Sequence, residues 1–145
     1  MRGIVVGFDG SENARYAMEW AMRQAAKEHS PLTVLTVNEV AVSPWTGEPA
    51  LMPSDPVLLE QARHAAEDAV GKAAAQTGAA ERPAVTVIAT SGFAGQELVE
   101  ASHGADMLVI GSRGQLGFPA LRVSEIATKV THYSTCPVVI VPPAS

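Results

Sequence analysis

Cysteine, aromatic residues and long apolar stretches are all scarce in this 145-residue sequence. The single cysteine, Cys136, excludes a disulfide within the chain and is typical of a protein in the reducing cytosol. No apolar run approaches the roughly 20 residues that cross a membrane. The opening segment Met1–Val6 has neither the long apolar stretch nor the cleavage site of a secretory signal. We therefore expect a cytoplasmic protein with no membrane contact.

Basic residues are also few. Ten Lys and Arg stand against 15 Asp and Glu, and the formal charge of −5 argues against non-specific nucleic-acid binding, which needs a basic surface. The charge is uneven, however. Arg113, Arg122 and Lys129 lie between positions 111 and 133 beside a single acid, Glu125. This stretch is the first candidate for contact with an anion.

The sequence offers no pattern for a metal site or a catalytic nucleophile. Cys136 precedes Pro137 at the entry to an apolar run and has no identifiable catalytic partner, so we predict a core thiol. The histidines are scattered, with no pair at metal-ligand spacing, and we expect neither a bound metal nor an enzyme. They are His29, His64, His103 and His132.

Five short aliphatic runs recur along the chain. They are apolar throughout instead of alternating with polar residues, which indicates strands buried on both faces of a parallel sheet. The runs are Gly3–Phe8, Leu32–Val37, Ala84–Ala89, Met107–Ile110 and Val138–Val141.

Helical periodicity fills the gaps between these runs. Ser11 is a predicted N-cap for a first helix whose inward stripe runs from Ala14 to Ala25. A second helix is expected over about Val57 to Thr77, with Leu59, Ala62, Ala66, Ala69, Val70 and Ala73 inward, and a third over about Gly95 to Ser102. The fourth carries an apolar stripe from Val123 to Val130. The alternation predicts one α/β domain over residues 1–145, a three-layer sandwich with right-handed crossovers.

One connection is unusually long. The segment Glu39–Pro56 contains four prolines, together with the apolar residues Trp45, Leu51 and Met52. It is either a mobile surface excursion or a functional lid or dimer contact. The sequence leaves both interpretations open.

Two strand ends carry residues suited to a ligand. Asp9, in Phe8-Asp9-Gly10-Ser11, could hydrogen-bond a base or ribose, or could stabilise its own turn. After the fourth strand, Gly111, Gly114 and Gly117 allow close approach of a ligand to the backbone, and Arg113 could hold a phosphate. Alternatively, these glycines only provide turns. In open α/β sheets, ligands bind at such carboxyl ends where the strand order reverses.

Four segments together closely resemble the universal stress protein family, in order and spacing, over essentially the whole chain. They are Val5–Ser11, Ala105–Gly114, Gly117-Phe118 and Cys136–Val141. The resemblance implies a five-stranded parallel sheet in the order 3-2-1-4-5 and commonly a homodimer. In one branch of the family it also implies an ATP-binding cleft between strands one and four.

The nucleotide-binding branch is marked by Gly, two residues, Gly, nine residues, then Gly followed by Ser or Thr. Gly111 and Gly114 match the first half, but Ser124 and Glu125 stand where Gly and Ser or Thr belong. We expect Glu125 in the first turn of the fourth helix, where a carboxylate repels phosphate and interacts favourably with the helix dipole. Alternatively, Glu125 points to solvent and Ser124 supplies the hydroxyl, or the intervening loop shifts register.

By resemblance, the adenosine subsite involves Asp9, Val37, Ile110 and Gly111, with Arg113 and Gly114 towards the phosphates. The resemblance also suggests that two copies pair along Val138–Val141, which we expect to be an aliphatic edge strand. Three hypotheses follow. The chain is a regulatory protein sensing ATP or another adenine nucleotide, a dimer acting only through protein contacts, or a slow ATP hydrolase.

Overall fold

The computed structural model describes residues 3–39, 56–77, 82–112 and 121–143, without the side chains of residues 39 and 121–125. Strands and helices alternate from one end of this chain to the other. The elements are β1 (Ile4–Gly7), α1 (Glu12–Glu28), β2 (Leu32–Glu39), α2 (Pro56–Thr77), β3 (Val85–Gly92), α3 (Ala94–Ser102), β4 (Met107–Gly111), α4 (Leu121–Tyr133) and β5 (Val138–Val141). The predicted alternation is confirmed.

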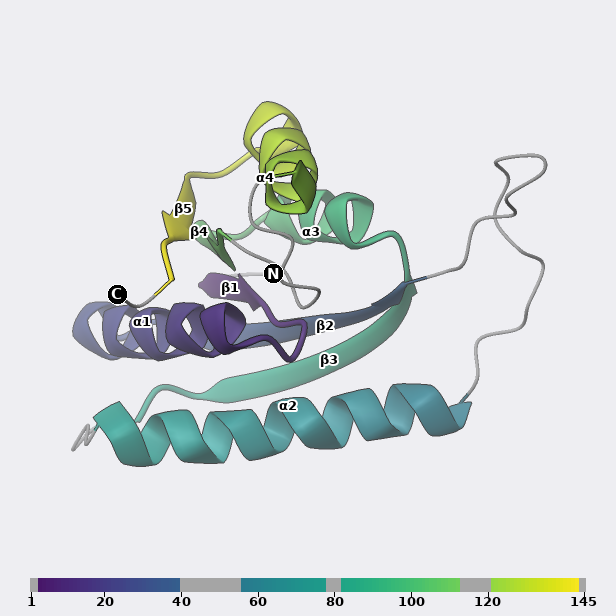
Figure 1. Cartoon of the computed structure of the whole chain (residues 1–145). Helices are drawn as coiled ribbons and strands as arrows, with labels where there is room; N and C mark the ends of the chain where they lie inside the picture. The colour runs from purple at the N-terminus through teal and green to yellow at the C-terminus, as the bar shows by residue number, and fades with distance from the viewer. Residues whose placement is uncertain (1–2, 40–55, 78–81, 113–120, 144–145) are drawn as a thin grey trace.

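The strands form one parallel sheet in the order β3-β2-β1-β4-β5 (Figure 1). The first strand, β1, lies at the centre: Ile4 stands opposite Leu32 of β2 on one side and opposite Met107 of β4 on the other. The strand order predicted from the family resemblance is therefore confirmed. It also fixes β5 as an edge strand, paired with β4 alone among the described strands.

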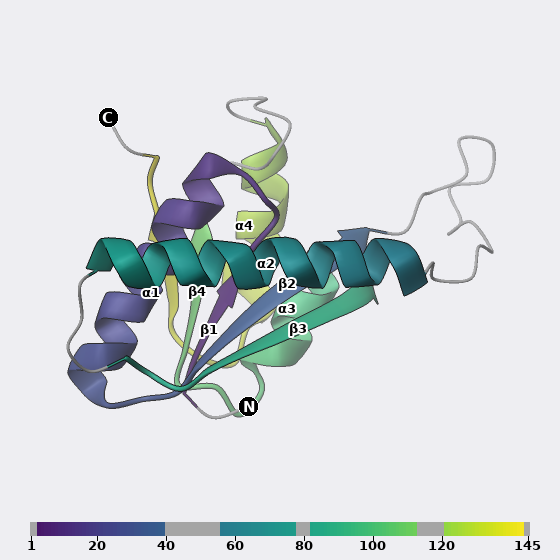
Figure 2. The same ribbon diagram turned by 90° about the horizontal axis from the view of Figure 1, so that it is seen from below.

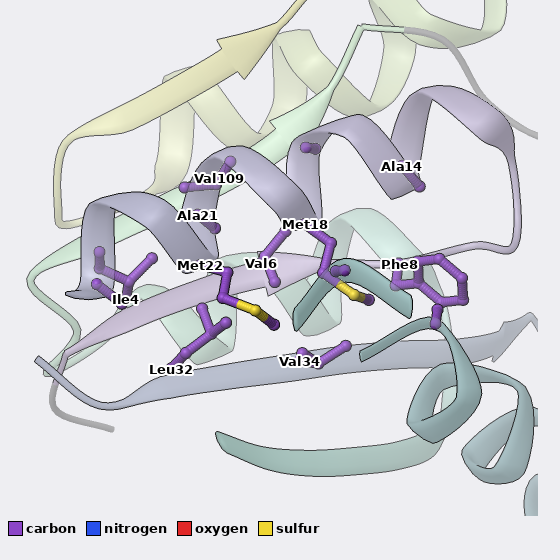
Figure 3. Close-up of a cluster of buried hydrophobic side chains, with 14 of the residues drawn as sticks. Ile4, Val6, Phe8, Ala14, Met18, Ala21, Met22, Leu32, Val34 and Val109 are labelled. Carbon is purple, nitrogen blue, oxygen red and sulfur yellow. The ribbon is translucent and has the colours of Figure 1, made fainter. Parts of the chain in front are cut away.

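The helices cover the two faces of the sheet in pairs. Figure 1 shows α1 and α2 on one face and α3 and α4 on the other. Close-up, Met18 and Met22 of α1 reach over Val6 of β1 and over Leu32 and Val34 of β2 (Figure 3). Both methionines are fully buried, and burying such a side chain stabilises the fold by about 1.5–3 kcal/mol.

The opposite face carries a second core. Val5 points to this side while its neighbour Val6 points to the first, which explains why the strands read as unbroken apolar runs. Leu35 and Leu108 from the neighbouring strands join Val5 here. The helices contribute Leu98 and Ala101 of α3 and Val130 of α4.

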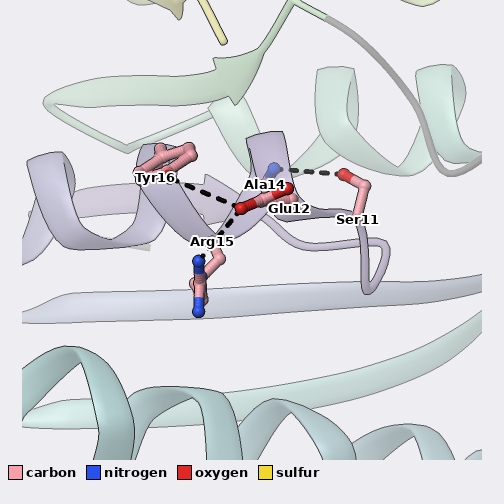
Figure 4. Close-up of polar contacts among 5 residues, drawn as sticks. All are labelled: Ser11, Glu12, Ala14, Arg15 and Tyr16. Atoms are coloured by element: carbon pink, nitrogen blue, oxygen red, sulfur yellow. Dashed lines mark hydrogen bonds and ion pairs between the residues drawn. The ribbon is translucent and has the colours of Figure 1, made fainter. Parts of the chain in front are cut away.

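A side-chain cap explains where α1 begins. The Ser11 hydroxyl oxygen accepts a hydrogen bond from the Ala14 amide at 3.1 Å, so the predicted N-cap is confirmed (Figure 4). Glu12, in the first turn, contacts the Arg15 guanidinium and the Tyr16 hydroxyl, each at 3.4 Å. These contacts are exposed and add little stability.

The two halves of α2 differ in burial. From Ala66 onward its inner face packs on the sheet as predicted, with Ala66, Ala69 and Ala73 buried. The predicted inward residues Leu59 and Ala62 are only half-buried, because the amino-terminal turns reach past the ends of β2 and β3 (Figure 2). Within the described part of the chain, no helix is long and apolar enough to cross a membrane.

Two strands extend further than their apolar runs predicted. The pairing of β2 with β3 continues through Asn38 opposite Ser91 and ends at Glu39 opposite Gly92. Backbone hydrogen bonding needs no apolar side chain. The pairing of β2 with β3 can therefore continue beyond the last aliphatic residues of the two strands. The long connection predicted over Glu39–Pro56 lies almost wholly outside the described residues.

Candidate functional site

The candidate site lies at the carboxyl ends of β1 and β4. These strands are neighbours, yet the chain leaves β1 for α1 on one face of the sheet and leaves β4 towards α4 on the other. Strand order therefore reverses between them, which is where open α/β sheets bind ligands. The structure places Asp9 just after β1 and Gly111 at the last position of β4.

Asp9 stabilises its own turn. Its Oδ1 accepts a hydrogen bond from the Ser11 amide at 2.9 Å, while Gly10 takes the positive φ of 85° that the turn requires. The turn role weighed from the sequence is therefore present. The turn bond leaves the Asp9 side chain able to bind a ligand. Asp9 is exposed, and the second oxygen of its carboxylate can accept a hydrogen bond.

Val37 and Ile110 lie on the face of the sheet covered by α3 and α4. Both belong to the second core, where Ile110 is buried and Val37 is half-buried. Gly7 stands beside them: a Cβ on Gly7 would lie 3.0 Å from Leu98 Cδ2 and 3.6 Å from Ile110 Cγ2. Neither Gly7 nor Leu98 was predicted to belong to the site. The glycine in an otherwise β-branched strand was the available signal.

Gly111 faces the other way. A Cβ on Gly111 would lie 3.0 Å from Asn13 Cγ and 3.1 Å from its Oδ1, so the space beside this glycine belongs to a side chain of α1. The structure therefore brings Val37 and Ile110 together on one face and places Gly111 against α1 on the other. Gly111 is required to be small for packing, independently of any ligand.

Asn13 is a further residue that sequence reasoning missed. Its side chain is 6% exposed, and its Nδ2 donates to the Val141 carbonyl at the end of β5, at 3.1 Å. The Ser112 hydroxyl donates to Asn13 Oδ1 at 3.4 Å, and the Ser112 amide donates to the same Val141 carbonyl at 3.0 Å. The signal was available, because Asn13 lies one helical turn before Ala17 and so continues the buried stripe of α1.

The predicted phosphate half is mostly outside the described residues. Arg113 and Gly114 fall in the part that the structure does not describe, and of Ser124 and Glu125 only the backbone assignment to α4 is described. That assignment corrects one expectation. Since α4 begins at Leu121, Glu125 is its fifth residue, and its first turn contains no acidic residue. The preceding Leu121 and Arg122 favour helix, which explains the earlier start.

The other groups that could carry chemistry are the metal-ligating side chains and Cys136. Among the described residues, no group of three or more His, Cys, Asp or Glu could hold a metal ion. Cys136 packs against the second core, where burial raises the pKa of its thiol and the Asp106 carboxylate raises it further. A raised pKa keeps this sulfur protonated and poorly nucleophilic.

A comparison with models of protein families shows to which family this chain belongs. The model of the universal stress protein family matches residues 1–142. The chain belongs to the universal stress protein family. A universal stress protein of Mycolicibacterium smegmatis is 31% identical over 139 residues, which cover 96% of this chain and 47% of that protein. This universal stress protein chain thus spans about half the length of the curated relatives it matches.

Solved structures of other universal stress proteins share the fold. UspA from Lactobacillus plantarum is similar with a TM-score of 0.73, at 19% identity and 97% coverage of both chains. A universal stress protein in complex with cAMP has a TM-score of 0.66 at 21% identity, covering 99% of this chain and 98% of that one. One from Archaeoglobus fulgidus in complex with dAMP has a TM-score of 0.64 at 15% identity, covering 97% and 98%. At these identities the likeness shows the fold.

Proposed function

We propose that this universal stress protein is a regulatory protein that binds an adenine nucleotide between β1 and β4. The observation that carries the proposal is the reversal of strand order at this edge, where the exposed Asp9 carboxylate keeps an oxygen for a ligand. The two solved relatives described as complexes with cAMP and dAMP support the same chemistry. Asp9 is proposed to accept from the ribose or base, beside Val37 and Ile110.

The phosphate half of the site is proposed to be altered. Glu125 replaces a hydroxyl residue of the glycine motif, and it lies beyond the first turn of α4. Only the first four amides of a helix lack an acceptor within the helix, so the amide of residue 125 is not among the free ones. We infer that adenosine and AMP bind at least as well as ATP, since added phosphates gain little here.

The role proposed for the site is binding without catalysis. Phosphoryl hydrolysis needs a water-positioning base and usually a metal ion to neutralise the phosphates. The described residues beside Asp9 and Gly111 include no cluster of metal-ligating side chains. A slow ATP hydrolase is the weakest of the three hypotheses, because the sequence places no general base or metal-binding acid beside the glycine loop.

A calorimetric titration with adenosine, AMP, cAMP, ADP and ATP tests the binding proposal. Replacing Asp9 by alanine is expected to weaken binding of adenosine and AMP about tenfold or more, because a hydrogen bond to a charged group contributes about 1.5–3 kcal/mol. Ser11→Ala is the matched control. It removes the cap of α1, at a cost of about 1 kcal/mol in stability, but keeps the Asp9 carboxylate.

The two variants separate the effect of the Asp9 carboxylate from a general loosening of the start of α1. Ser11→Ala removes only the cap and keeps the Ser11 amide that bonds to Asp9, so equal losses of affinity in the two variants would assign the effect to the start of α1. No heat with any of the five compounds at millimolar concentration would overturn the nucleotide proposal. The dimer acting through protein contacts would then be the leading hypothesis.

We further propose a homodimer that forms along β5. This strand is at the edge of the sheet, and its Ile140 is 40% exposed. An uncovered aliphatic edge strand favours pairing with a second copy. Sedimentation at about tens of micromolar protein is expected to show a dimer, and Ile140→Lys a monomer. Leu58→Lys, at an exposed apolar residue of α2, is expected to stay dimeric. A monomeric wild type would overturn this part of the proposal.

A further inference from the structure

One carbonyl joins three segments that are far apart in the sequence. The Val141 carbonyl at the end of β5 accepts from Asn13 Nδ2 at 3.1 Å and from the Ser112 amide at 3.0 Å. Asn13 lies in the first turn of α1, 128 positions before Val141, and Ser112 directly follows β4. A third hydrogen bond links Ser112 and Asn13 directly: the Ser112 hydroxyl donates to Asn13 Oδ1 at 3.4 Å.

These three segments belong to two different proposed surfaces. Asn13 follows the Asp9–Ser11 turn, and Ser112 follows Gly111, so both stand directly behind the proposed nucleotide site. Val141 is the last residue of the edge strand that is proposed to pair with a second copy. A single buried side chain thus connects the ligand edge with the dimer edge.

We propose that Asn13 is a positioning residue that couples occupancy of the β1–β4 site to dimer formation through β5. The coupling rests on the proposed function, because it needs both a nucleotide and a dimer. Its physical basis is the tight setting of the amide. Asn13 is 6% exposed and lies against Gly111, where even a Cβ would be 3.0 Å from Asn13 Cγ.

A shift of the first turn of α1 cannot be absorbed locally in this setting. Moving Asn13 away from Val141 would break the hydrogen bond from a buried amide to this carbonyl, which is costly, so the end of β5 is expected to follow α1. The other end of β5 is held independently. The Leu108 amide donates to the Pro137 carbonyl at 2.9 Å, and the Thr135 amide donates to Ser102 Oγ at 3.1 Å.

Coupling between two binding events is reciprocal. If AMP tightens the dimer by some factor, the dimer binds AMP more tightly than the monomer by the same factor. For the wild type we expect a factor of about five or more, at the lower end of typical coupling. A residue with a merely structural role would change the dimer dissociation constant by the same factor with and without AMP. The ratio of the two dissociation constants would then stay the same.

The test measures the dimer dissociation constant by sedimentation, with and without saturating AMP. Asn13→Ala is expected to reduce the ratio of the two constants to about one. Alanine is the best helix former, so the first turn of α1 should keep its structure.

Thr135→Val is the matched control, because it removes the Thr135 hydroxyl contacts at the far end of β5, and the ratio should stay at the wild-type value. Ser112→Ala, which keeps the amide donor but loses the Asn13 contact, serves if Asn13→Ala does not fold, and a lowered ratio is expected.

The outcomes separate this inference from the proposed function. A wild type that binds AMP and forms a dimer unaffected by AMP overturns the coupling but keeps the binding proposal. A ratio that persists in Asn13→Ala, or that falls equally in Thr135→Val, also overturns it. A wild type that binds no nucleotide at millimolar concentration, or that stays monomeric, overturns the coupling together with that part of the proposed function.

Discussion

Replacing Gly3 by alanine is expected to lower the free energy of unfolding by about 3 kcal/mol or more. Gly3 has a φ of 86°, a left-handed conformation that costs other residues roughly 1–2 kcal/mol. The new Cβ would also lie 2.4 Å from the Pro31 carbonyl oxygen, which accepts the Ile4 amide. Gly3 cannot move aside easily, because its amide and carbonyl both bond to Asp106. Urea unfolding followed by circular dichroism measures the loss.

Gly71→Ala is the matched control for this prediction. Gly71 lies inside α2 with open space where a Cβ would be added, so alanine is expected to raise stability by about 0.5–1 kcal/mol. The two glycines thus predict changes of opposite sign from the same substitution. A loss below about 1 kcal/mol for Gly3→Ala would mean that the β1 entry relaxes without strain, and the argument from its backbone would be wrong.

The double variant Ser124→Gly with Glu125→Ser is expected to raise ATP affinity at least tenfold, or about 1.4 kcal/mol. Two changes act together. Glycine at 124 weakens the first turn of α4, which begins at Leu121, and so favours a later helix start with free amides at residue 125. Serine at 125 removes a negative charge and supplies a hydroxyl. Calorimetric titration with ATP measures the gain.

Adenosine provides the internal control, because it carries no phosphate and its affinity should not change in the double variant. Glu125→Gln isolates the charge and is expected to give only part of the gain. If ATP affinity is unchanged or weaker in a folded double variant, the obstacle to phosphate binding lies elsewhere than at Ser124 and Glu125.

Most of the fold could be predicted from apolar patterns. The buried stripe of α1 from Ala14 to Ala25 is confirmed residue by residue, because helix periodicity and burial are coupled directly. The strand order needed the family resemblance, since patterns locate strands without saying which are neighbours. The ends of β2 and β3 escaped prediction, because the polar residues Asn38 and Ser91 continue the ladder through their backbones alone.

The site was predicted less completely, and for a different reason. Asp9 and Gly111 lie at the carboxyl ends of β1 and β4, and Val37 and Ile110 pack on one face of the sheet, but the packing of Gly111 on the other face depends on its neighbour in α1. The bond from Asn13 to Val141 joins residues that no local spacing relates. Long-range polar contacts of this kind follow from the assembled fold, not from a sequence motif.

The central position of β1 has a consequence for the order of folding during synthesis. β1 finds its first neighbour, β2, after one helix, but its second neighbour, β4, follows only after one more strand and two more helices. The bond from the Gly3 amide to Asp106 spans 103 positions. At about 5–20 residues per second, the ribosome leaves one side of β1 unpaired for several seconds. During this time the half built from β1, α1, β2, α2 and β3 has an open edge, and chaperones that bind exposed strands have their longest opportunity to act on the nascent chain.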